Sequence, residues 1–228
     1  MGSLTYIGHS AFALEADGIQ VLIDPFITGN PVARHSPEHF SPSTILLTHA
    51  HNDHVGDTVA ISSRTGATTI SVVELADHLE QQGINAIGAN HGGTVTFEGG
   101  TVKLVQAWHS SSFTTPDGVV APGVPAGLVV RFGGKTVYFA GDTSLFSDMK
   151  LIGEEGIDVA ILPIGDHFTM GPDDAVRAVK FIDPDVVIPC HYNTFPPIQQ
   201  DAEEFKRNVE RETSATCEVI APGSAYQF

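Results

Sequence analysis

Apolar runs separated by short polar turns recur along the chain and predict several β-strands. Residues 12–16 and 19–23 flank Asp17-Gly18, a dipeptide preferred in two-residue hairpin turns, so the chain is expected to open as antiparallel sheet. Further strands are predicted near residues 67–71, 94–97, 101–107, 127–132, 136–140, 158–163, 185–189 and 216–220.

Three segments place apolar residues at helical spacing between or after these strands. Their apolar positions are Val72, Leu75, Ala76 and Leu79, closed by Gly83; Ala175, Val176, Val179 and Ile182, behind Pro172; and Ile198, Ala202, Phe205 and Val209. The order is strands, helix, strands, and then alternating β and α. This order predicts an α/β fold in which two packed sheets are covered by helices on the outside. No domain boundary is visible, and we expect a single domain over residues 1–228.

Two stretches have the turn-rich composition of functional loops. Residues 26–43 and 110–126 are rich in proline, and the second also contains Gly118 and Gly123. Long loops in a compact domain are uncommon unless they cover a site or are mobile. Because residues 110–126 directly follow His109, we predict a substrate lid there; a disordered connector is the alternative.

The hexapeptide at residues 49–54, His-Ala-His-Asn-Asp-His, follows the apolar run 45–48. It places four potential metal ligands, His49, His51, Asp53 and His54, in one turn. Imidazole and carboxylate groups are the ligands expected for zinc, manganese or iron. The alternative is a polar surface loop, but further candidate ligands elsewhere in the chain favour a metal site.

Three more candidate ligands each follow an apolar run. His109 follows residues 102–108, Asp142 follows 136–141, and His191 follows 186–190. In open α/β sheets ligands collect at the carboxyl ends of strands, so these segments are expected to meet in one site. Seven ligands are too many for one tetrahedral ion and suit two ions about 3.5–4 Å apart. We therefore expect two divalent ions as cofactors, zinc first, with manganese or iron as alternatives.

The spacing of these residues resembles that of the metallo-β-lactamase superfamily over nearly the whole chain. Beyond the hexapeptide, the resemblance is carried by residues 8–12 (GHSAF), 22–26 (LIDPF), 140–143 (AGDT), 165–171 (GDHFTMG) and 189–194 (PCHYNT). These segments look like a branch of small metal-dependent hydrolases related to the L-ascorbate-6-phosphate lactonases. The resemblance implies the metallo-β-lactamase fold, an αββα sandwich of two packed mixed β-sheets flanked by helices.

The resemblance also implies how the ligands divide between the two ions. It places His49, His51 and His109 on the first ion, Asp53, His54 and His191 on the second, and Asp142 between them as a bridge. Many zinc β-lactamases with this fold carry cysteine where this chain has Asp142, which argues against β-lactam hydrolysis. The absence of a long basic arm argues against a ribonuclease.

The expected chemistry is hydrolysis of a small ester, lactone or phosphodiester by a hydroxide that the two ions hold. Asp53 is expected to orient that hydroxide as well as to bind metal. His167 and His9 are the candidates for protonating the leaving group or binding a substrate anion, although either could be structural. Asp24, at the end of a predicted strand, is expected to hold a ligand imidazole in one tautomer or to brace the metal loop.

The net charge and the small number of basic residues limit the classes of binding partner that we expect. The chain has 228 residues and a formal net charge of −16 with only eleven basic residues, which disfavours nucleic acid and anionic membranes as partners. An anionic small substrate stays open, because two cations can reverse the local field. No apolar stretch is long enough to span a membrane and no signal-like start is present, so we expect a cytoplasmic protein. A homo-oligomer stays open.

The two cysteines, Cys190 and Cys217, are too few for a disulfide framework, which fits a reducing compartment. Cys190 could be read as a nucleophile beside His191. The favoured interpretation is a small buried residue that ends a core strand.

Two other functional classes compete with the hydrolase. One is a di-iron redox protein on the same scaffold, which would normally come with a flavin-binding domain. The other is a non-catalytic metal-binding protein, in which the full ligand set and the predicted lid would lack a purpose. Metal analysis with an absorption spectrum would distinguish the di-iron redox protein from the hydrolase. A turnover screen would distinguish the non-catalytic metal-binding protein from it.

Overall fold

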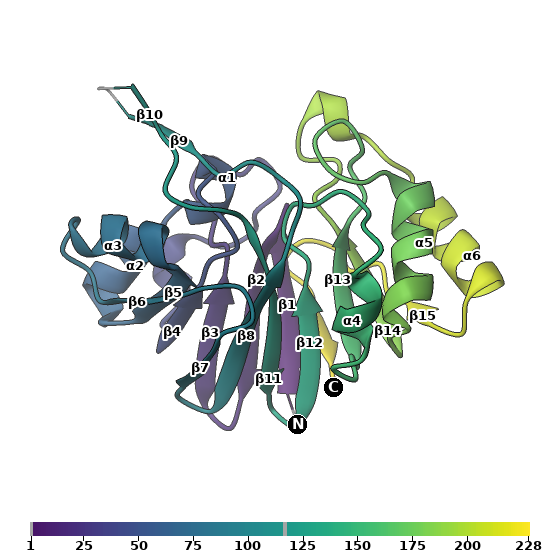
Figure 1. The fold of residues 1–228 in the computed structure, drawn as a ribbon, viewed down its shortest axis with the longest axis horizontal. Coiled ribbons are helices and arrows are strands. Elements are labelled where there is room, and N and C mark those ends of the chain that lie inside the picture. Colours follow the sequence, from purple (N-terminus) through teal and green to yellow (C-terminus); the bar gives the residue numbers. More distant parts are fainter. Residues whose placement is uncertain (1, 116–117) are drawn as a thin grey trace.

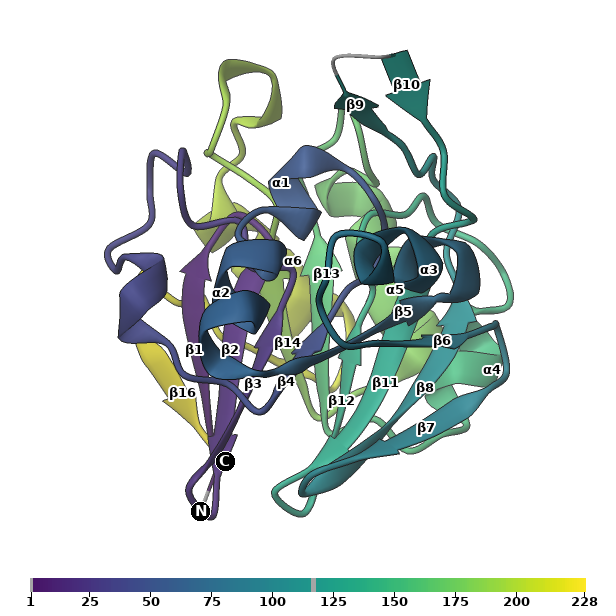
Figure 2. The same ribbon diagram turned by 90° about the vertical axis from the view of Figure 1, so that its left-hand side faces the viewer.

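Two seven-stranded β-sheets pack face to face, and helices cover the outer face of each (Figures 1 and 2). The computed structural model describes residues 2–115 and 118–228. This architecture confirms the predicted fold class. Met1 and two residues of the predicted lid, Pro116 and Asp117, lie outside the described residues.

The first sheet is built almost entirely from the first part of the chain. Its strand order is β16-β1-β2-β3-β4-β5-β6. The pairs from β16 to β3 are antiparallel and those from β3 to β6 are parallel. The strands are β1 (Gly2–Gly8), β2 (Ala11–Ala16), β3 (Ile19–Ile23), β4 (Thr44–Leu46), β5 (Thr68–Val72), β6 (Ala86–Ala89) and β16 (Ala225–Gln227).

The second sheet follows in the chain and repeats the same plan of antiparallel strands and then parallel ones. Its order is β15-β14-β13-β12-β11-β8-β7, with parallel pairs from β12 to β15. The strands are β7 (Thr94–Phe97), β8 (Gly100–Gln106), β11 (Ala126–Phe132), β12 (Lys135–Phe139), β13 (Val159–Pro163), β14 (Val186–Cys190) and β15 (Thr216–Cys217). A separate hairpin, β9 (Phe113–Thr115) with β10 (Gly118–Val120), projects from the body (Figure 1).

Helices cover the two sheets on opposite sides of the molecule (Figure 1). Asp201 caps the last of them by accepting hydrogen bonds from the backbone nitrogens of Glu203 and Glu204. In the part of the chain that the structure describes, the helices are α1 (Asn52–Val55), α2 (Thr58–Thr65), α3 (Val73–Glu80), α4 (Met149–Gly153), α5 (Pro172–Ile182) and α6 (Ala202–Glu212), with 3₁₀ turns at Pro37–His39 and Pro196–Ile198. Within those described ranges, no helix is long and apolar enough to span a membrane.

The core has two layers because successive residues of a strand point to opposite faces of its sheet. Leu128 and Val130 of β11 face the core between the sheets, whereas Val129 packs with the residues under the helices. Across the sheet interface, the rings of Phe12 and Phe139 lie 5.7 Å apart. This packing fixes the two sheets against each other, so side chains from both can meet at a shared edge.

Most predicted elements are confirmed, and three predictions are wrong in detail. The hairpin turn at Asp17-Gly18 forms with both residues at positive φ, 52° and 79°, as this turn type requires. The strand expected at 216–220 ends at Cys217, and the last helix begins at Ala202 rather than near Ile198. Residues 110–126 are not wholly a loop, because they contain the β9–β10 hairpin.

Candidate metal centre

The predicted ligands lie in helix α1 and on loops that follow strands of the two sheets. Figure 1 shows α1 beyond one end of the strands, near the top of the view. The 49–54 hexapeptide follows β4 and runs into the short helix α1. His109, Asp142 and His191 follow β8, β12 and β14 of the second sheet. The carboxyl ends of strands from both sheets therefore converge, as the sequence predicted.

Four of these side chains form one group. His49 Nε2 lies 2.9 Å from His51 Nδ1, and the ring of His109 lies 5.2 Å from that of His49 and 5.0 Å from that of His51. Asp142 Oδ2 lies 3.5 Å from His109 Nε2. One candidate ligand atom from each of these four residues lies within 4.8 Å of the others, which is the spacing of a metal site. We call His49, His51 and His109 the first triad.

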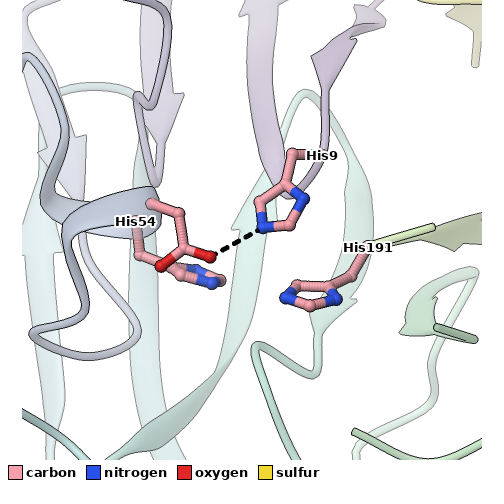
Figure 3. Close-up of side chains that lie close together, drawn as sticks. His9, His54 and His191 are labelled. Atoms are coloured by element: carbon pink, nitrogen blue, oxygen red, sulfur yellow. Dashed lines mark hydrogen bonds and ion pairs between the residues drawn. The ribbon is translucent and has the colours of Figure 1, made fainter. Parts of the chain in front are cut away.

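A second group lies on the other side of Asp142. His54 Nε2 is 3.3 Å from Asp142 Oδ1, and His191 Nε2 is 3.1 Å from Asp142 Oδ2. Candidate ligand atoms of Asp53, His54, His191 and also His9 lie within 4.8 Å of one another (Figure 3). We call Asp53, His54 and His191 the second triad. Asp142 contacts histidines of both triads, as expected of a bridging carboxylate.

Asp24, at the end of β3, supports both triads from behind. Its Oδ1 accepts from the backbone nitrogen of Thr48 at 2.8 Å, and its Oδ2 accepts from the Thr48 hydroxyl at 2.6 Å and from His54 Nδ1 at 2.7 Å. The Thr48 hydroxyl in turn lies 3.0 Å from His49 Nδ1. Since an ionised carboxylate only accepts, His54 and then His49 must each carry a proton on Nδ1, which leaves Nε2 as the atom that faces the centre. Asp24 therefore contacts both the predicted metal loop and a candidate ligand imidazole, as the predicted supporting role requires.

The residues fit divalent ions because buried polar atoms at the centre lack hydrogen bonds. His54 Nε2 and Asp142 Oδ1 lie 3.3 Å apart without forming a hydrogen bond, and His191 Nδ1 likewise has no hydrogen-bond partner within residues 2–115 and 118–228. Buried polar atoms in native proteins are normally paired, so atoms of this kind at a cluster of imidazoles and carboxylates indicate a bound cation. The further grouping of Asp24 with His49 and His54 is a support and not another site, because both Asp24 oxygens are already bonded.

Burial and mutual charge shift the acidity of these groups. Burial would raise the pKa of Asp142, but the fields of His191 and His54 outweigh it and hold that pKa well below its usual range. Burial lowers the pKa of His49, and it also lowers those of His51 and His109. Burial opposes a charge on His54, yet Asp142 and Asp24 raise its pKa. The carboxylate of Asp142 thus stays ionised and first-triad imidazoles stay neutral, the forms that bind metal.

Strained backbone gathers around the same loops. Within the described ranges, six of the eight non-glycine residues with positive φ lie on loops that carry predicted site residues: His9, Asp24, Asp166, His167, His191 and Asn193. Such conformations cost of order 1–3 kcal/mol each and cluster at functional sites. Backbone strain is invisible to periodicity, so the sequence could not have shown this signal.

The other predicted residues are placed as follows. His9 is fully buried, and its Nε2 bonds to Asp53 Oδ2 at 3.0 Å. His167 is exposed, and its ring contacts that of Phe168 at 4.4 Å. Cys190 is buried and free, and burial raises the pKa of its thiol, which confirms a core residue rather than a nucleophile.

Two hydroxyls that the sequence reading did not single out contact predicted ligands. Thr48 bonds to His49, and Ser110 Oγ lies 3.3 Å from His51 Nε2. Each hydroxyl stands directly next to a candidate ligand in the chain. This position next to a candidate ligand in the sequence was the signal that could have identified the two hydroxyls.

Comparison with known proteins agrees with this centre. Residues 3–191 match the model of the β-lactamase superfamily domain. The chain is 51% identical to a UPF0173 metal-dependent hydrolase of Thermus thermophilus over 100% of both chains, and 50% identical to one of Methanopyrus kandleri over 98% of this chain and 99% of that one. It also resembles the solved structure of Igni18, a metallo hydrolase of Ignicoccus hospitalis, with a TM-score of 0.90, 44% identity, and coverage of 100% and 99%.

The chain therefore belongs to the metallo-β-lactamase superfamily, and within it to the metal-dependent hydrolases that its relatives at about 50% identity represent.

Proposed function

We propose that the protein hydrolyses a small ester, lactone or phosphodiester at a centre formed by the two triads and Asp142. The observation that carries the proposal is the position of the buried Asp142 carboxylate, which contacts His54 through Oδ1 and both His191 and His109 through Oδ2. Two divalent ions bound there would supply a hydroxide at neutral pH and neutralise the oxyanion that forms. Zinc is our first expectation, with manganese or iron as alternatives.

Side chains of the protein would then orient the nucleophile and contact the substrate. A third of the Asp53 side chain is exposed, so its carboxylate can meet a nucleophile that enters from solvent. The hydrogen bond from His9 and the fields of His54 and His9 outweigh burial and keep the Asp53 pKa well below its usual range. Asp53 is therefore an acceptor that orients the nucleophile. In this proposal no side chain of the protein acts as the nucleophile.

His167 is the candidate for meeting the substrate's leaving group or anionic part. It lies on the β13–α5 loop, which is tied to the Asp142 loop because Met170 N donates to Thr143 O at 3.0 Å. We expect His167→Ala to impair turnover while both ions are retained. His39→Ala, which removes a histidine outside both triads, is the matched control. Loss of both ions from His167→Ala would instead make His167 a structural or ligand residue.

Apolar side chains at the rim favour a substrate with an apolar group. Trp108 is 59% exposed, and Phe168 is 53% exposed. The Trp108 backbone is held by Thr143 Oγ1 at 3.0 Å, so both aromatics stand on loops joined through Thr143. We expect benzoyl esters to be better substrates than acetyl esters, with Trp108→Ala removing the preference. Leu151→Ala, at a 61% exposed residue of α4, should not remove it.

The decisive experiment combines metal quantification with a panel of phosphodiesters, lactones, thioesters and β-lactams. The purified protein is assayed as prepared, after chelation, and after return of zinc, manganese or iron. The proposal expects two ions per chain and a turnover that disappears on chelation and returns with metal. Two bound ions with no turnover on the panel would favour a non-catalytic metal-binding protein, and an absorption spectrum of coupled iron would favour the redox alternative.

A further inference from the structure

His9 lies where the two sheets approach each other at the ligand edge. It follows β1 of the first sheet, is fully buried, and adopts a left-handed φ of 61°. Its carbonyl oxygen accepts from the backbone nitrogen of His191 at 2.7 Å and from the Tyr6 hydroxyl at 3.2 Å. The His9 backbone thus joins the end of β1 to the loop that carries a second-triad ligand.

The His9 side chain makes two more links. Nε2 lies 3.0 Å from Asp53 Oδ2, the contact drawn as a dashed line in Figure 3, and Nδ1 lies 2.9 Å from the Thr194 hydroxyl. Asp53 stands on the α1 segment of the first sheet's side, whereas Thr194 follows β14 of the second. One imidazole therefore connects loops of both sheets at the second triad.

The proton on this ring can be placed from its partners. Its Nε2 faces the carboxylate of Asp53, and its Nδ1 faces the hydroxyl of Thr194. A carboxylate accepts but cannot donate, which puts the N–H on Nε2. Nδ1 is hydrogen-bonded to the Thr194 hydroxyl, which also lies 3.4 Å from the Tyr192 carbonyl oxygen. Both ring nitrogens are used, and no lone pair is left for a metal ion.

We infer that His9 is a positioning residue that fixes the orientation of Asp53 in the second triad and anchors it to the 191–194 loop. This inference rests on the proposed metal centre, and it replaces the proton-donating role that the sequence suggested for His9. The competing role is a fourth ligand of the second ion, because His9 groups with Asp53, His54 and His191 within 4.8 Å. That role needs the other tautomer, with the proton on Nδ1 and a lone pair on Nε2.

The tautomer is a direct test that does not depend on turnover. Long-range nitrogen–proton correlation spectra of the zinc-loaded protein identify the protonated ring nitrogen of His9, with assignment by comparison with His9→Gln. We expect the proton on Nε2. A proton on Nδ1 with Nε2 on zinc would overturn the inference.

Variants separate positioning from a general structural role. His9→Asn suits the left-handed backbone, since asparagine tolerates it, but its side chain is too short to reach Asp53. We expect second-triad zinc affinity to fall about 10- to 100-fold, the usual effect of losing a residue that orients a ligand, with first-triad affinity unchanged. His9→Gln has a longer amide that can donate to Asp53, and it should recover most of the affinity. Zinc affinities are measured by competition with a chromophoric chelator.

The hydroxyl at residue 194 gives a second, milder pair of variants. Thr194→Val removes the hydroxyl that is hydrogen-bonded to His9 Nδ1 and keeps the side-chain shape, so it should weaken the same zinc site, while Thr194→Ser should not. Chemical unfolding of each metal-free variant shows whether the fold is intact.

Three outcomes would overturn the inference. They are unchanged zinc binding in His9→Asn, loss of both ions in that variant, and a His9→Gln variant as damaged as His9→Asn. Failure of the proposed function looks different: the zinc and tautomer results hold, but no ester, lactone or phosphodiester is hydrolysed. Conversely, normal turnover by His9→Asn would refute only the inference.

Discussion

The two triads around Asp142 differ in how the protein holds them. In the first triad the supporting contacts are two hydroxyls, Thr48 at His49 and Ser110 at His51. In the second triad the supports are a carboxylate at His54 and a buried imidazole at Asp53.

Hydrogen bonds to ionised groups are roughly twice as strong as those between neutral ones. The second triad is therefore the more rigidly held of the two, and the first relies more on the ion itself. Asp24 is the exception, because through Thr48 it reaches His49 as well as His54. This arrangement teaches that one carboxylate behind the site can fix the geometry of both triads.

The largest effect is expected where the triads meet. Asp142→Ala removes the carboxylate that contacts both, so it should abolish hydrolysis and remove ions from both triads while the fold survives. Metal quantification, turnover and circular dichroism check this. Asp148→Ala, an exposed position a few residues further along the same segment, is the control. Unchanged turnover in Asp142→Ala would refute the bridging role.

Asp24→Asn tests the shared support. An amide cannot accept the three hydrogen bonds that the carboxylate takes, so zinc affinity should fall about 10- to 100-fold in both triads. Chelator competition measures both affinities. Asp57→Asn is the matched control, because the Asp57 side chain accepts two backbone hydrogen bonds from Ile27 and Thr28 and contacts no predicted ligand. An effect confined to one triad would show that Asp24 does not couple them.

Thr48→Val should change the zinc affinity of one triad and not of the other. It removes the hydroxyl between Asp24 and His49 at nearly constant volume, and it leaves the Asp24–His54 bond in place. We expect first-triad zinc affinity to fall about tenfold with little change in the second. The same competition assay reads both, and Thr48→Ser should restore the wild-type values. Equal losses in both triads would contradict the separation.

The smallest effect is expected at the solvent side of the first triad. Ser110→Ala removes a 3.3 Å contact to His51 that is open to solvent. At the low end of about 0.5 kcal/mol for a net hydrogen bond, first-triad affinity should change about two- to threefold. Isothermal titration with zinc is sensitive enough to detect this. A tenfold loss would mean that the outer hydroxyls matter as much as Asp24.

The sequence indicated the candidate ligands and one of their supports, Asp24, but not the other supports. His49, His51, Asp53 and His54 could be found because metal chemistry requires them at close spacing after a strand. Asp24 could be placed because it too ends a strand. The pairing of His9 with Asp53 could not be predicted, since it depends on how the loop after β1 and the segment after β4, 44 residues further along the chain, lie at one edge of the first sheet.

The missed elements have physical reasons as well. Helix α2 (Thr58–Thr65) is rich in β-branched and hydroxyl residues of low helix propensity, so its helical form depends on tertiary packing. Strand β15 stops at Cys217 although apolar residues continue, because the chain then leaves for the other sheet and ends as β16 beside β1. Local patterns do not encode either constraint.

The order of strands along the chain has a further consequence. Strands β1–β6, joined by β16, make one sheet, and β7, β8 and β11–β15 make the other. Each triad takes two side chains from the part of the chain that builds the first sheet and one from the part that builds the second. A pair of bound cations would therefore cross-link the two parts of the chain that build the two sheets. If the chain were cleaved in the turn between β6 and β7, neither fragment alone could bind an ion firmly, because each would lack part of both triads. Metal binding would then stabilise the complex that forms when the two fragments reassemble.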